Sequence, residues 1–287
     1  MEGLIVLAKY GTYKVISDNV LYSCSVRGNV KKNKKPTVGD YVIFDEKSFI
    51  IEEIKERKTL LKRPNIANID QLLIIFSLIE PEFSYLLAFK YLTYANKYNL
   101  DSKIILTKSD REEIDKDKLK EIKETFKKIG VDVYVISSKT KEGLDEINGL
   151  FKGKISALLG QSGVGKSSLL NAINNDFKRS IGEYSMALGR GKHETKETIL
   201  LSYEGGFIAD TPGFSSLDLE LYKEDLAKYF PSFDKYMKDC FYNDCIHVNE
   251  PKCRIKEAVE LKEIPQIAYD CYLKLSSESI SYIKRYQ

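Results

Sequence analysis

A glycine-rich loop near the middle of the chain has the residue types and spacing that bind phosphate. Gly160, Gly165, Lys166 and Ser167 satisfy G-x-x-x-x-G-K-S, between an apolar segment, ISALLG, and an amphipathic one, SSLLNAI. Backbone amides of such a loop hold phosphate oxygens, the lysine neutralises the outer phosphates and the serine hydroxyl binds Mg2+. The alternative is an ordinary glycine-rich turn. We predict nucleotide binding by Gly160, Gln161, Ser162, Gly163, Val164, Gly165, Lys166, Ser167 and Ser168, with Lys166 also catalytic.

Base recognition needs other residues, because a phosphate loop accepts adenine and guanine nucleotides alike. Asp110 ends the segment IILTKSD, and its carboxylate can accept hydrogen bonds from N1 and N2 of guanine. The aliphatic part of Lys108 can cover the ring. Alone, a strand-ending KSD is more typical of a solvated turn, but SSK closes the next predicted strand, as in the second guanine loop of GTPases. We predict guanine binding by Thr107, Lys108, Asp110, Ser137, Ser138 and Lys139.

A third group of residues is suited to Mg2+ and the γ-phosphate. Asp210 ends the apolar segment GFIAD, where its carboxylate can hold Mg2+ through water, and the amide of Gly213 can contact the γ-phosphate. Between the phosphate loop and this DTPG motif lies the polar segment Gly189–Thr198, which is typical of a nucleotide-sensing switch. An inert surface loop is the alternative. We predict Ser167, Asp210 and Thr195 as magnesium ligands, with Thr198 as the rival of Thr195. Thr195 is also predicted to be catalytic, and Asp210 and Gly213 to bind the nucleotide.

Three of the five cysteines lie close to one of the two histidines. Cys240, Cys245, His247 and Cys253 have the spacing C-x4-C-x-H-x5-C, and three thiolates with one imidazole supply the donors of a tetrahedral structural zinc site. Chance clustering is the alternative. We predict one Zn2+ ion, held by all four side chains with no open position for catalysis. The remaining cysteines, Cys24 and Cys271, are expected to be packed apolar residues.

Residues 1–63 are predicted to form a separate unit, because they contain five short apolar segments divided by turn signals. The number and length of the segments predict an OB-fold β-barrel. A basic loop lies between the third and fourth segments, and with nearby aromatic residues it is suited to RNA, although a merely solvated loop is the alternative. The predicted RNA-binding residues are Arg27, Lys31, Lys32, Lys34 and Lys35, and the aromatic residues are Tyr10, Tyr13, Tyr22 and Phe44.

Residues 64–217 alternate between strand-like and helix-like segments, which predicts a parallel sheet with helices on both faces. The two base loops precede the phosphate loop, the reverse of the usual GTPase order. A circular permutation explains this, since all the motifs still lie at the carboxyl edge of one sheet. Permutation also leaves both ends of the domain free for appendages. Residues 218–287 are predicted to form a helical zinc-binding domain, to which the segment after DTPG can pass the nucleotide state.

Composition sets further limits. The chain has 287 residues and a net charge of only +3, so a nucleic-acid role depends on local charge. It contains no run of 18 apolar residues and no N-terminal leader of the secretory type, so we expect a soluble, cytoplasmic protein that does not bind membranes.

Taken together, the motifs resemble those of the ribosome small subunit-dependent GTPase A family (RsgA, also YjeQ or YloQ), which are circularly permuted GTPases. The resemblance covers nearly the whole chain and includes RGNVKKNKKPTVGDYV, TKSD, GQSGVGKSSLLNAI, GRGKHETKET, DTPGFSSLD and CFYNDCIHVNEPKC. It implies an OB-fold, a permuted GTPase domain and a zinc domain, and we expect the protein to be a monomer. It also implies GTP and GDP as ligands, and the small (30S) ribosomal subunit and its rRNA as partners. In that family, the particle stimulates GTP hydrolysis during late subunit maturation and hydrolysis promotes release.

The chain departs from the family pattern at two positions. Thr107 stands where many members have asparagine, at a position that braces the nucleotide loops, so the affinity for nucleotide is expected to differ. The sequence HETK replaces the usual HTTT, which leaves Thr195 as the surviving threonine.

Phe214 follows DTPG where many GTPases place a water-positioning glutamine, so slow intrinsic turnover is expected. We hypothesise that His193 is catalytic and positions the attacking water when the ribosome orders its segment. The alternative is that His193 contacts only RNA or the loop backbone. Two other functional classes stay open on sequence grounds: a GTP-gated RNA-binding module without hydrolysis, and a P-loop ATPase or kinase, which TKSD disfavours.

Overall fold

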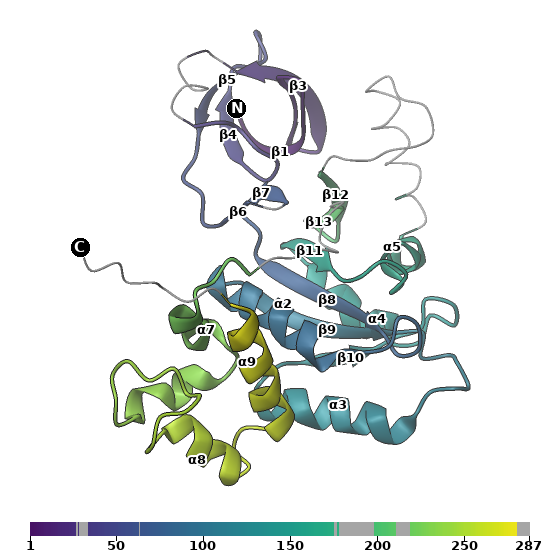
Figure 1. The fold of residues 1–287 in the computed structure, drawn as a ribbon. Coiled ribbons are helices and arrows are strands. Elements are labelled where there is room, and N and C mark those ends of the chain that lie inside the picture. The colour runs from purple at the N-terminus through teal and green to yellow at the C-terminus, as the bar shows by residue number, and fades with distance from the viewer. Residues whose placement is uncertain are drawn as a thin grey trace, which may run out of the picture.

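Five N-terminal strands close into a barrel in the computed structural model, which describes residues 1–26, 28, 34–62, 64–174, 177, 198–210 and 219–279 (Figure 1). The strands are β1 (Glu2–Lys9), β2 (Thr12–Ser17), β3 (Val20–Val26), β4 (Tyr41–Phe44) and β5 (Ile50–Ile54). They pair in the order β1-β2-β3-β5-β4, and β4 pairs back to β1. Alternate residues such as Val15, Val42 and Ile51 fill the interior. The predicted OB-fold barrel is confirmed.

A short hairpin that was not predicted follows the barrel. Its strands are β6 (Leu60–Lys62) and β7 (Asn65–Ala67). An isolated bridge joins Val38 to Ile66, and the amide of Ala67 donates to the carbonyl of Val38 at 2.9 Å. The domain boundary expected between residues 63 and 64 therefore falls between the two strands of this hairpin.

The central sheet carries the motifs. Its parallel strands are β8 (Gln71–Ser77), β9 (Asp101–Thr107), β10 (Val133–Val135), β11 (Ile155–Leu159) and β13 (Gly206–Asp210), arranged as β10-β9-β8-β11-β13. A further strand, β12 (Ile199–Tyr203), was not identified in the sequence and runs antiparallel to β13. The four strands β8, β9, β10 and β11 end in polar loops at one edge, because parallel strands have their carboxyl ends on the same side.

Helices cover both faces of this sheet, as predicted. Leu72, Ile74 and Phe76 of β8 belong to a hydrophobic cluster with α2 (Tyr85–Lys97) and α3 (Lys116–Lys128). Leu73 and Ile75 point to the opposite face and belong to a second cluster with α4 (Leu144–Asn148) and α5 (Lys166–Ile173). Because successive strand residues alternate between faces, a strand that is buried on both sides must be apolar throughout.

The C-terminal unit consists of α7 (Lys223–Tyr229), α8 (Arg254–Glu260), α9 (Gln266–Glu278) and intervening turns. Its predicted helical character is confirmed. Phe230, after α7, stacks on Phe89 of α2 with ring centroids 5.3 Å apart, so this unit shares a core with one face of the central sheet. Among the described residues, none of the helices is long and apolar enough to span a membrane.

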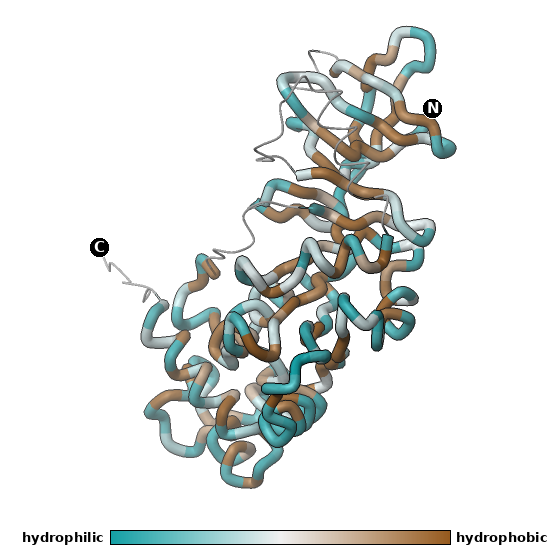
Figure 2. The backbone as a smooth tube through the Cα atoms, turned by 90° about the vertical axis from the view of Figure 1, so that its right-hand side faces the viewer, coloured by the Kyte–Doolittle hydropathy of each residue, from teal (hydrophilic) through white to brown (hydrophobic). Residues whose placement is uncertain are grey.

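The barrel and the central sheet meet at one pair of strands. Leu7 of β1 pairs with Ile199 of β12 in antiparallel register, which joins the described strands of the two units into one sheet. The molecule is elongated, with the barrel at one end and the C-terminal helices at the other (Figure 1). Hydrophobic and hydrophilic segments alternate along the backbone in both parts of the molecule (Figure 2).

Candidate nucleotide and metal sites

The phosphate loop connects β11 to α5, as the motif requires. A side chain at Gly160 would place its Cβ atom 2.4 Å from the carbonyl oxygen of Ile75, so only glycine fits beside β8. Gly165 precedes α5 with φ of 99°, a conformation that L-residues with side chains rarely adopt. The two glycines of the motif thus reflect close backbone approach and an unusual backbone turn, and the start of α5 that follows them is where backbone amides can bind phosphate oxygens.

Lys166 and Asp210 are two charged residues beside the phosphate loop. Nζ of Lys166 donates to the carbonyls of Gly160 and Gln161 at 2.6 Å each, which folds the side chain over the loop. Burial lowers the pKa of Lys166, and the charge of Asp210 partly offsets this. Burial likewise raises the pKa of Asp210, against the influence of Lys166. Lys166 and Asp210 are thus two partly buried groups of opposite charge beside the phosphate loop. A negatively charged phosphate would stabilise the charge of Lys166, and a divalent cation would stabilise that of Asp210.

Thr107 links the first base loop to the phosphate loop. Its buried Oγ1 lies 2.6 Å from the carbonyl oxygen of Val164 and 3.2 Å from that of Phe76. The hydroxyl carries one proton, so the shorter contact is the hydrogen bond that it donates. The position that many family members fill with asparagine thus retains a polar contact between the two loops.

Asp110 is held by the second base loop. Oγ of Ser137 donates to Oδ1 of Asp110 at 2.7 Å, and this bond is the main cause that lowers the pKa of Asp110. The same Oγ accepts from the amides of Lys139 at 3.1 Å and Thr140 at 3.0 Å. Ser137 is fully buried, and its hydrogen bonds fix the orientation of Asp110 and of the SSK turn. Lys108 has φ of 64°, and its Nζ donates to the carbonyl of Glu80.

These loops enclose a pocket of about 590 Å3. Of the predicted nucleotide residues, the walls include Thr107, Lys108, Asp110, Ser138, Lys139, Gly165 and Ser168. Arg111, Lys141, Asn171 and Ala172 also line it and were not predicted. A sequence signal existed for Asn171, which lies three residues after Ser168 and hence on the same face of α5. Arg111 and Lys141 directly extend the two base loops.

Several predicted residues lie outside the part of the chain that the structure describes: His193, Thr195, Gly213, Arg27, Lys31 and Lys32. The rival magnesium ligand, Thr198, is described, and it is partly buried directly before β12.

The described end of the basic loop is anchored to the barrel. Nζ of Lys34 donates to the carbonyl of Lys55 at 3.0 Å, and Lys35 is exposed. Arg57 bonds both carboxylate oxygens of the buried Asp40, at 2.6 and 2.8 Å, and donates to the carbonyl of Lys35 at 2.8 Å.

One expectation about the barrel is wrong. Tyr13 and Phe44 are only 4% and 1% exposed in the barrel core, so they cannot stack on bases. They occupy inward positions of β2 and β4, and period-two burial explains why. Tyr10, in the turn between β1 and β2, is 92% exposed, and Nζ of Lys9 lies 5.2 Å from its ring centroid.

The four predicted zinc ligands converge. Nδ1 of His247 lies 3.5 Å from Sγ of Cys240 and 3.3 Å from Sγ of Cys253, and those sulfurs are 4.0 Å apart. All four ligand atoms, including Sγ of Cys245, lie within 4.8 Å of one another. Tetrahedral Zn2+ with bonds of about 2.0 Å to nitrogen and 2.3 Å to sulfur keeps its ligands roughly 3.5–3.8 Å apart, so the cluster fits the ion.

Neighbouring groups hold this cluster in place. Glu250 accepts hydrogen bonds from the amides of Ile246, Val248 and Asn249 at 3.0, 2.9 and 3.1 Å. His247 has φ of 58°, and its carbonyl accepts a bond from Tyr269 Oη at 2.9 Å. Burial raises the pKa of Cys245 to about 12, so a thiolate here requires a bound cation. The donor set is therefore suited to a structural metal ion.

Comparison with known proteins agrees with this architecture. The family model described as RsgA GTPase matches residues 54–220, and the RsgA N-terminal domain model matches residues 2–48. "Small ribosomal subunit biogenesis GTPase RsgA" of Geobacillus kaustophilus is 41% identical over 96% of this chain and 97% of that protein. The protein of the same name from Bacillus subtilis is 40% identical, with the same coverage of both chains.

Two solved structures share the fold. YloQ, described as a circularly permuted GTPase, is 37% identical with a TM-score of 0.82, over 96% of this chain and 94% of that one. YjeQ from Thermotoga maritima is 34% identical with a TM-score of 0.84, over 96% and 97% of the two chains. The predicted permutation is thus confirmed, and the family match favours a GTPase over an ATPase or kinase. The chain belongs to the RsgA family of circularly permuted GTPases and is a GTP-hydrolysing enzyme.

Proposed function

We propose that this GTPase acts in biogenesis of the small ribosomal subunit, that the subunit stimulates its GTP hydrolysis, and that hydrolysis releases it from the particle. The observation that carries this proposal is the likeness to relatives named for small ribosomal subunit biogenesis, which extends over 96% of the chain and so includes the barrel and the zinc cluster as well as the GTPase domain. In this proposal the protein works as a cytoplasmic monomer.

Guanine selection is assigned to Asp110. Its carboxylate, oriented by Ser137 at 2.7 Å, accepts from N1 and N2 of guanine. Adenine would present an acceptor nitrogen to the same carboxylate, an unpaired contact that costs about 1–3 kcal/mol. Lys108 covers the ring, and the SSK turn of Ser138 and Lys139 contributes to the same wall of the pocket.

The outer phosphates and Mg2+ are assigned to the phosphate loop and Asp210. Both side chains are partly buried at this edge, which lowers the pKa of Lys166 and raises that of Asp210, and a phosphate and a divalent cation would compensate their charges. Ser167 and Asp210 hold Mg2+ together with Thr195 or Thr198. Gly213 contacts the γ-phosphate, and His193 positions the attacking water.

The barrel is assigned to rRNA. Lys34 and Lys35, with Arg27, Lys31 and Lys32 before them, neutralise phosphates, and the exposed ring of Tyr10 offers a stacking surface. Zn2+ at the cysteine–histidine cluster has a structural role, because the four ligands leave no open coordination position.

The test is steady-state GTP hydrolysis with and without purified small ribosomal subunits, with large subunits and ATP as controls. We expect stimulation that requires GTP and the small subunit and that is lost in Lys166→Ala. Asp110→Asn should lose GTP but gain xanthosine triphosphate, whose base presents a carbonyl where guanine presents an amino group. GTP binding without stimulation by small subunits would contradict the proposed partner.

A further inference from the structure

Strand β1 contributes to three hydrophobic cores with three consecutive residues. Ile5 belongs to the barrel interior, Val6 to the cluster of α2, α3 and α9, and Leu7 to the cluster that includes Val164 of the phosphate loop and Leu169 of α5. The pairing of β1 with β2 shifts register between Ile5 and Leu7, which marks a β-bulge. A bulge turns the following side chain to another face, so it explains how a barrel strand places Leu7 in the GTPase core.

Leu7 stands in a row of cross-strand neighbours that ends at the proposed magnesium ligand. It lies opposite Ile199 of β12, and Ile199 lies opposite Asp210 of β13. Adjacent strands are about 4.8 Å apart, so Leu7 and Asp210 are roughly 10 Å from each other across one intervening strand. Leu7 is 1% exposed and Ile199 is 2% exposed, so this row is tightly packed.

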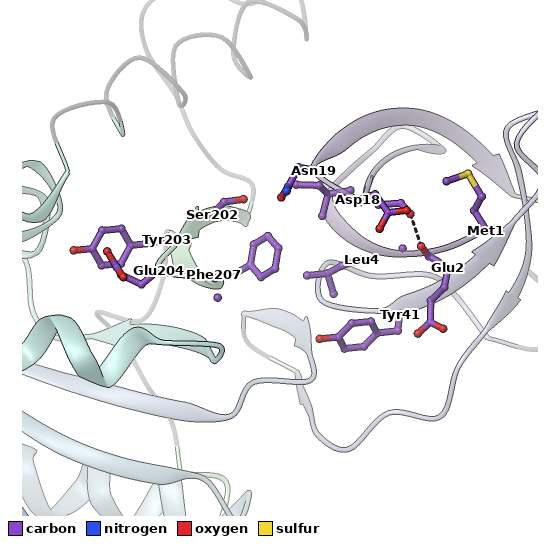
Figure 3. Close-up of a pocket in the computed structure, with 15 residues that line it drawn as sticks. Met1, Glu2, Leu4, Asp18, Asn19, Tyr41, Ser202, Tyr203, Glu204 and Phe207 are labelled. Carbon is purple, nitrogen blue, oxygen red and sulfur yellow. Dashed lines mark hydrogen bonds between the residues drawn. The ribbon is translucent and has the colours of Figure 1, made fainter.

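The connection between the barrel and the β12–β13 hairpin is local. Away from Leu7 a pocket of about 790 Å3 separates the two, with Leu4, Asn19 and Tyr41 on the barrel side and Ser202 and Phe207 on the hairpin side (Figure 3). The register between β1 and β12 contains one residue pair, Leu7 with Ile199. The barrel thus holds the hairpin at the end that carries Asp210 and leaves the opposite end beside open space.

We propose that Leu7 is a positioning residue for Asp210: the barrel supplies the packing that holds the carboxyl end of β13 in the place where Asp210 binds Mg2+. Without the Leu7 side chain, Ile199 loses the packing of its outer neighbour, and the pairing of β1 with β12 is left with backbone contacts alone. The carboxylate of Asp210 then has a wider range of positions, which weakens its hold on the ion. This proposal rests on the magnesium role assigned to Asp210 above.

The test compares Leu7→Ala with Ile5→Ala. Both residues are almost fully buried aliphatic side chains of β1, but Ile5 packs only in the barrel, so its variant matches the loss of barrel packing. The readout is the Mg2+ concentration that gives half-maximal GTP hydrolysis, together with the gain in GDP affinity that Mg2+ produces. Loss of a supporting residue around a metal ligand typically costs about tenfold or more in affinity. We expect a rise of about tenfold for Leu7→Ala, little change for Ile5→Ala, and recovery in Leu7→Met, which preserves volume.

Epistasis identifies the route of the effect. If Leu7 acts through Asp210, adding Leu7→Ala to Asp210→Asn changes the Mg2+ dependence of GDP binding no further. If the alanine variants fail to fold, Leu7→Val and Ile5→Val give the same comparison with smaller cavities. Equal Mg2+ dependence in the Leu7 and Ile5 variants would overturn the positioning role alone. Absence of Mg2+-dependent turnover in the wild-type protein would instead remove the assigned role of Asp210.

Discussion

Thr107 shows how one hydroxyl group can replace a larger side chain. It contacts the carbonyls of Val164 and Phe76, and it therefore joins the strand end that carries TKSD to the phosphate loop. Asparagine could bond more widely at this position, but a buried threonine has one donor and no mobile amide. The hydroxyl of Thr107 therefore connects the TKSD loop to the phosphate loop by a specific hydrogen bond.

Removing this hydroxyl should weaken nucleotide binding. Thr107→Val preserves the shape but removes the hydrogen bond that the hydroxyl donates to the carbonyl of Val164, and an unmade buried hydrogen bond costs about 1–3 kcal/mol. We expect the affinity for fluorescent GDP to fall by about five- to tenfold. Thr93→Val is the matched control, because the Thr93 hydroxyl is equally buried but donates to Phe89 inside α2 at 2.7 Å. Equal losses of affinity in the two variants would contradict a specific role of Thr107.

Asp210 should make the stability of the metal-free protein depend on pH. Burial raises its pKa above the ordinary 3.8, so the folded state binds the proton more tightly than the unfolded chain. The free energy of unfolding therefore falls as pH rises from about 3.8 through the raised pKa, and it stays reduced above that range. In EDTA at pH 7.5, Asp210→Asn should be more stable than wild type, with a difference that shrinks as the pH falls through that range.

Urea titrations of both proteins between pH 4.5 and 8 measure this difference. Lys166→Met provides a second arm, since the charge of Lys166 opposes the shift and its loss should raise the pKa of Asp210 further. A variant Asp210→Asn that is less stable than wild type at every pH would show that burial of the charge is not the dominant effect.

At the scale of elements, the loop from Cys245 to Cys253 depends on one carboxylate. Glu250 accepts three backbone hydrogen bonds from residues on both sides of His247, whose left-handed backbone directs Nδ1 toward the sulfurs. Tyr269 and Tyr272 donate to the carbonyls of His247 and Ile246 from α9. The conformation of the ligand loop is thus fixed by Glu250 within the loop and by the two tyrosines of α9.

Glu250→Gln should weaken zinc binding without removing a ligand. The amide group of glutamine would turn a donor toward one of the backbone amides, and such changes around a metal site cost about 10–100-fold in affinity. Competition with a chromogenic chelator measures the loss. Glu260→Gln, on the exposed side of α8, is the control. Unchanged affinity in Glu250→Gln would mean that the tyrosine contacts alone shape the loop.

At the scale of the whole molecule, the units are joined by shared cores. Leu7 of the barrel belongs to the hydrophobic core on one face of the central sheet, and Phe230 of the C-terminal unit belongs to the core on the other face. Phe230 is 1% exposed between Phe89 of α2 and Tyr272 of α9, with ring centroids 5.3 and 5.2 Å away. Such burial is typical of one cooperative core and not of mobile appendages.

Phe230→Ala should therefore destabilise the GTPase domain as well as the zinc unit. A fully buried phenylalanine replaced by alanine costs about 3–5 kcal/mol. We expect calorimetry to show a single main transition for the two units, shifted to lower temperature. Phe241→Ala, at a residue that is 64% exposed in the same unit, should shift it little. Two separate transitions, of which only one moves in Phe230→Ala, would contradict a shared core.

Local patterns in the sequence were sufficient for the elements and the motifs. Five apolar segments predicted the barrel strands, the glycine spacing predicted the phosphate loop, and four residues within fourteen predicted the metal cluster. Each depends on backbone conformation or on ligands that are close along the chain. The hydrophobic alternation of β2 and β4 also contained the information that Tyr13 and Phe44 face inward, although their aromatic character suggested stacking.

Only the tertiary structure decided how distant segments meet. The bond from Ser137 to Asp110 joins residues that are 27 positions apart in the chain. The pairing of Leu7 with Ile199 joins a barrel strand to β12, a strand that the sequence pattern did not reveal. An apolar residue in a strand pattern is expected to be buried, but the sequence does not indicate which of the hydrophobic cores it joins. The bulge between Ile5 and Leu7 settles that choice, because it turns Leu7 out of the barrel and into the GTPase core.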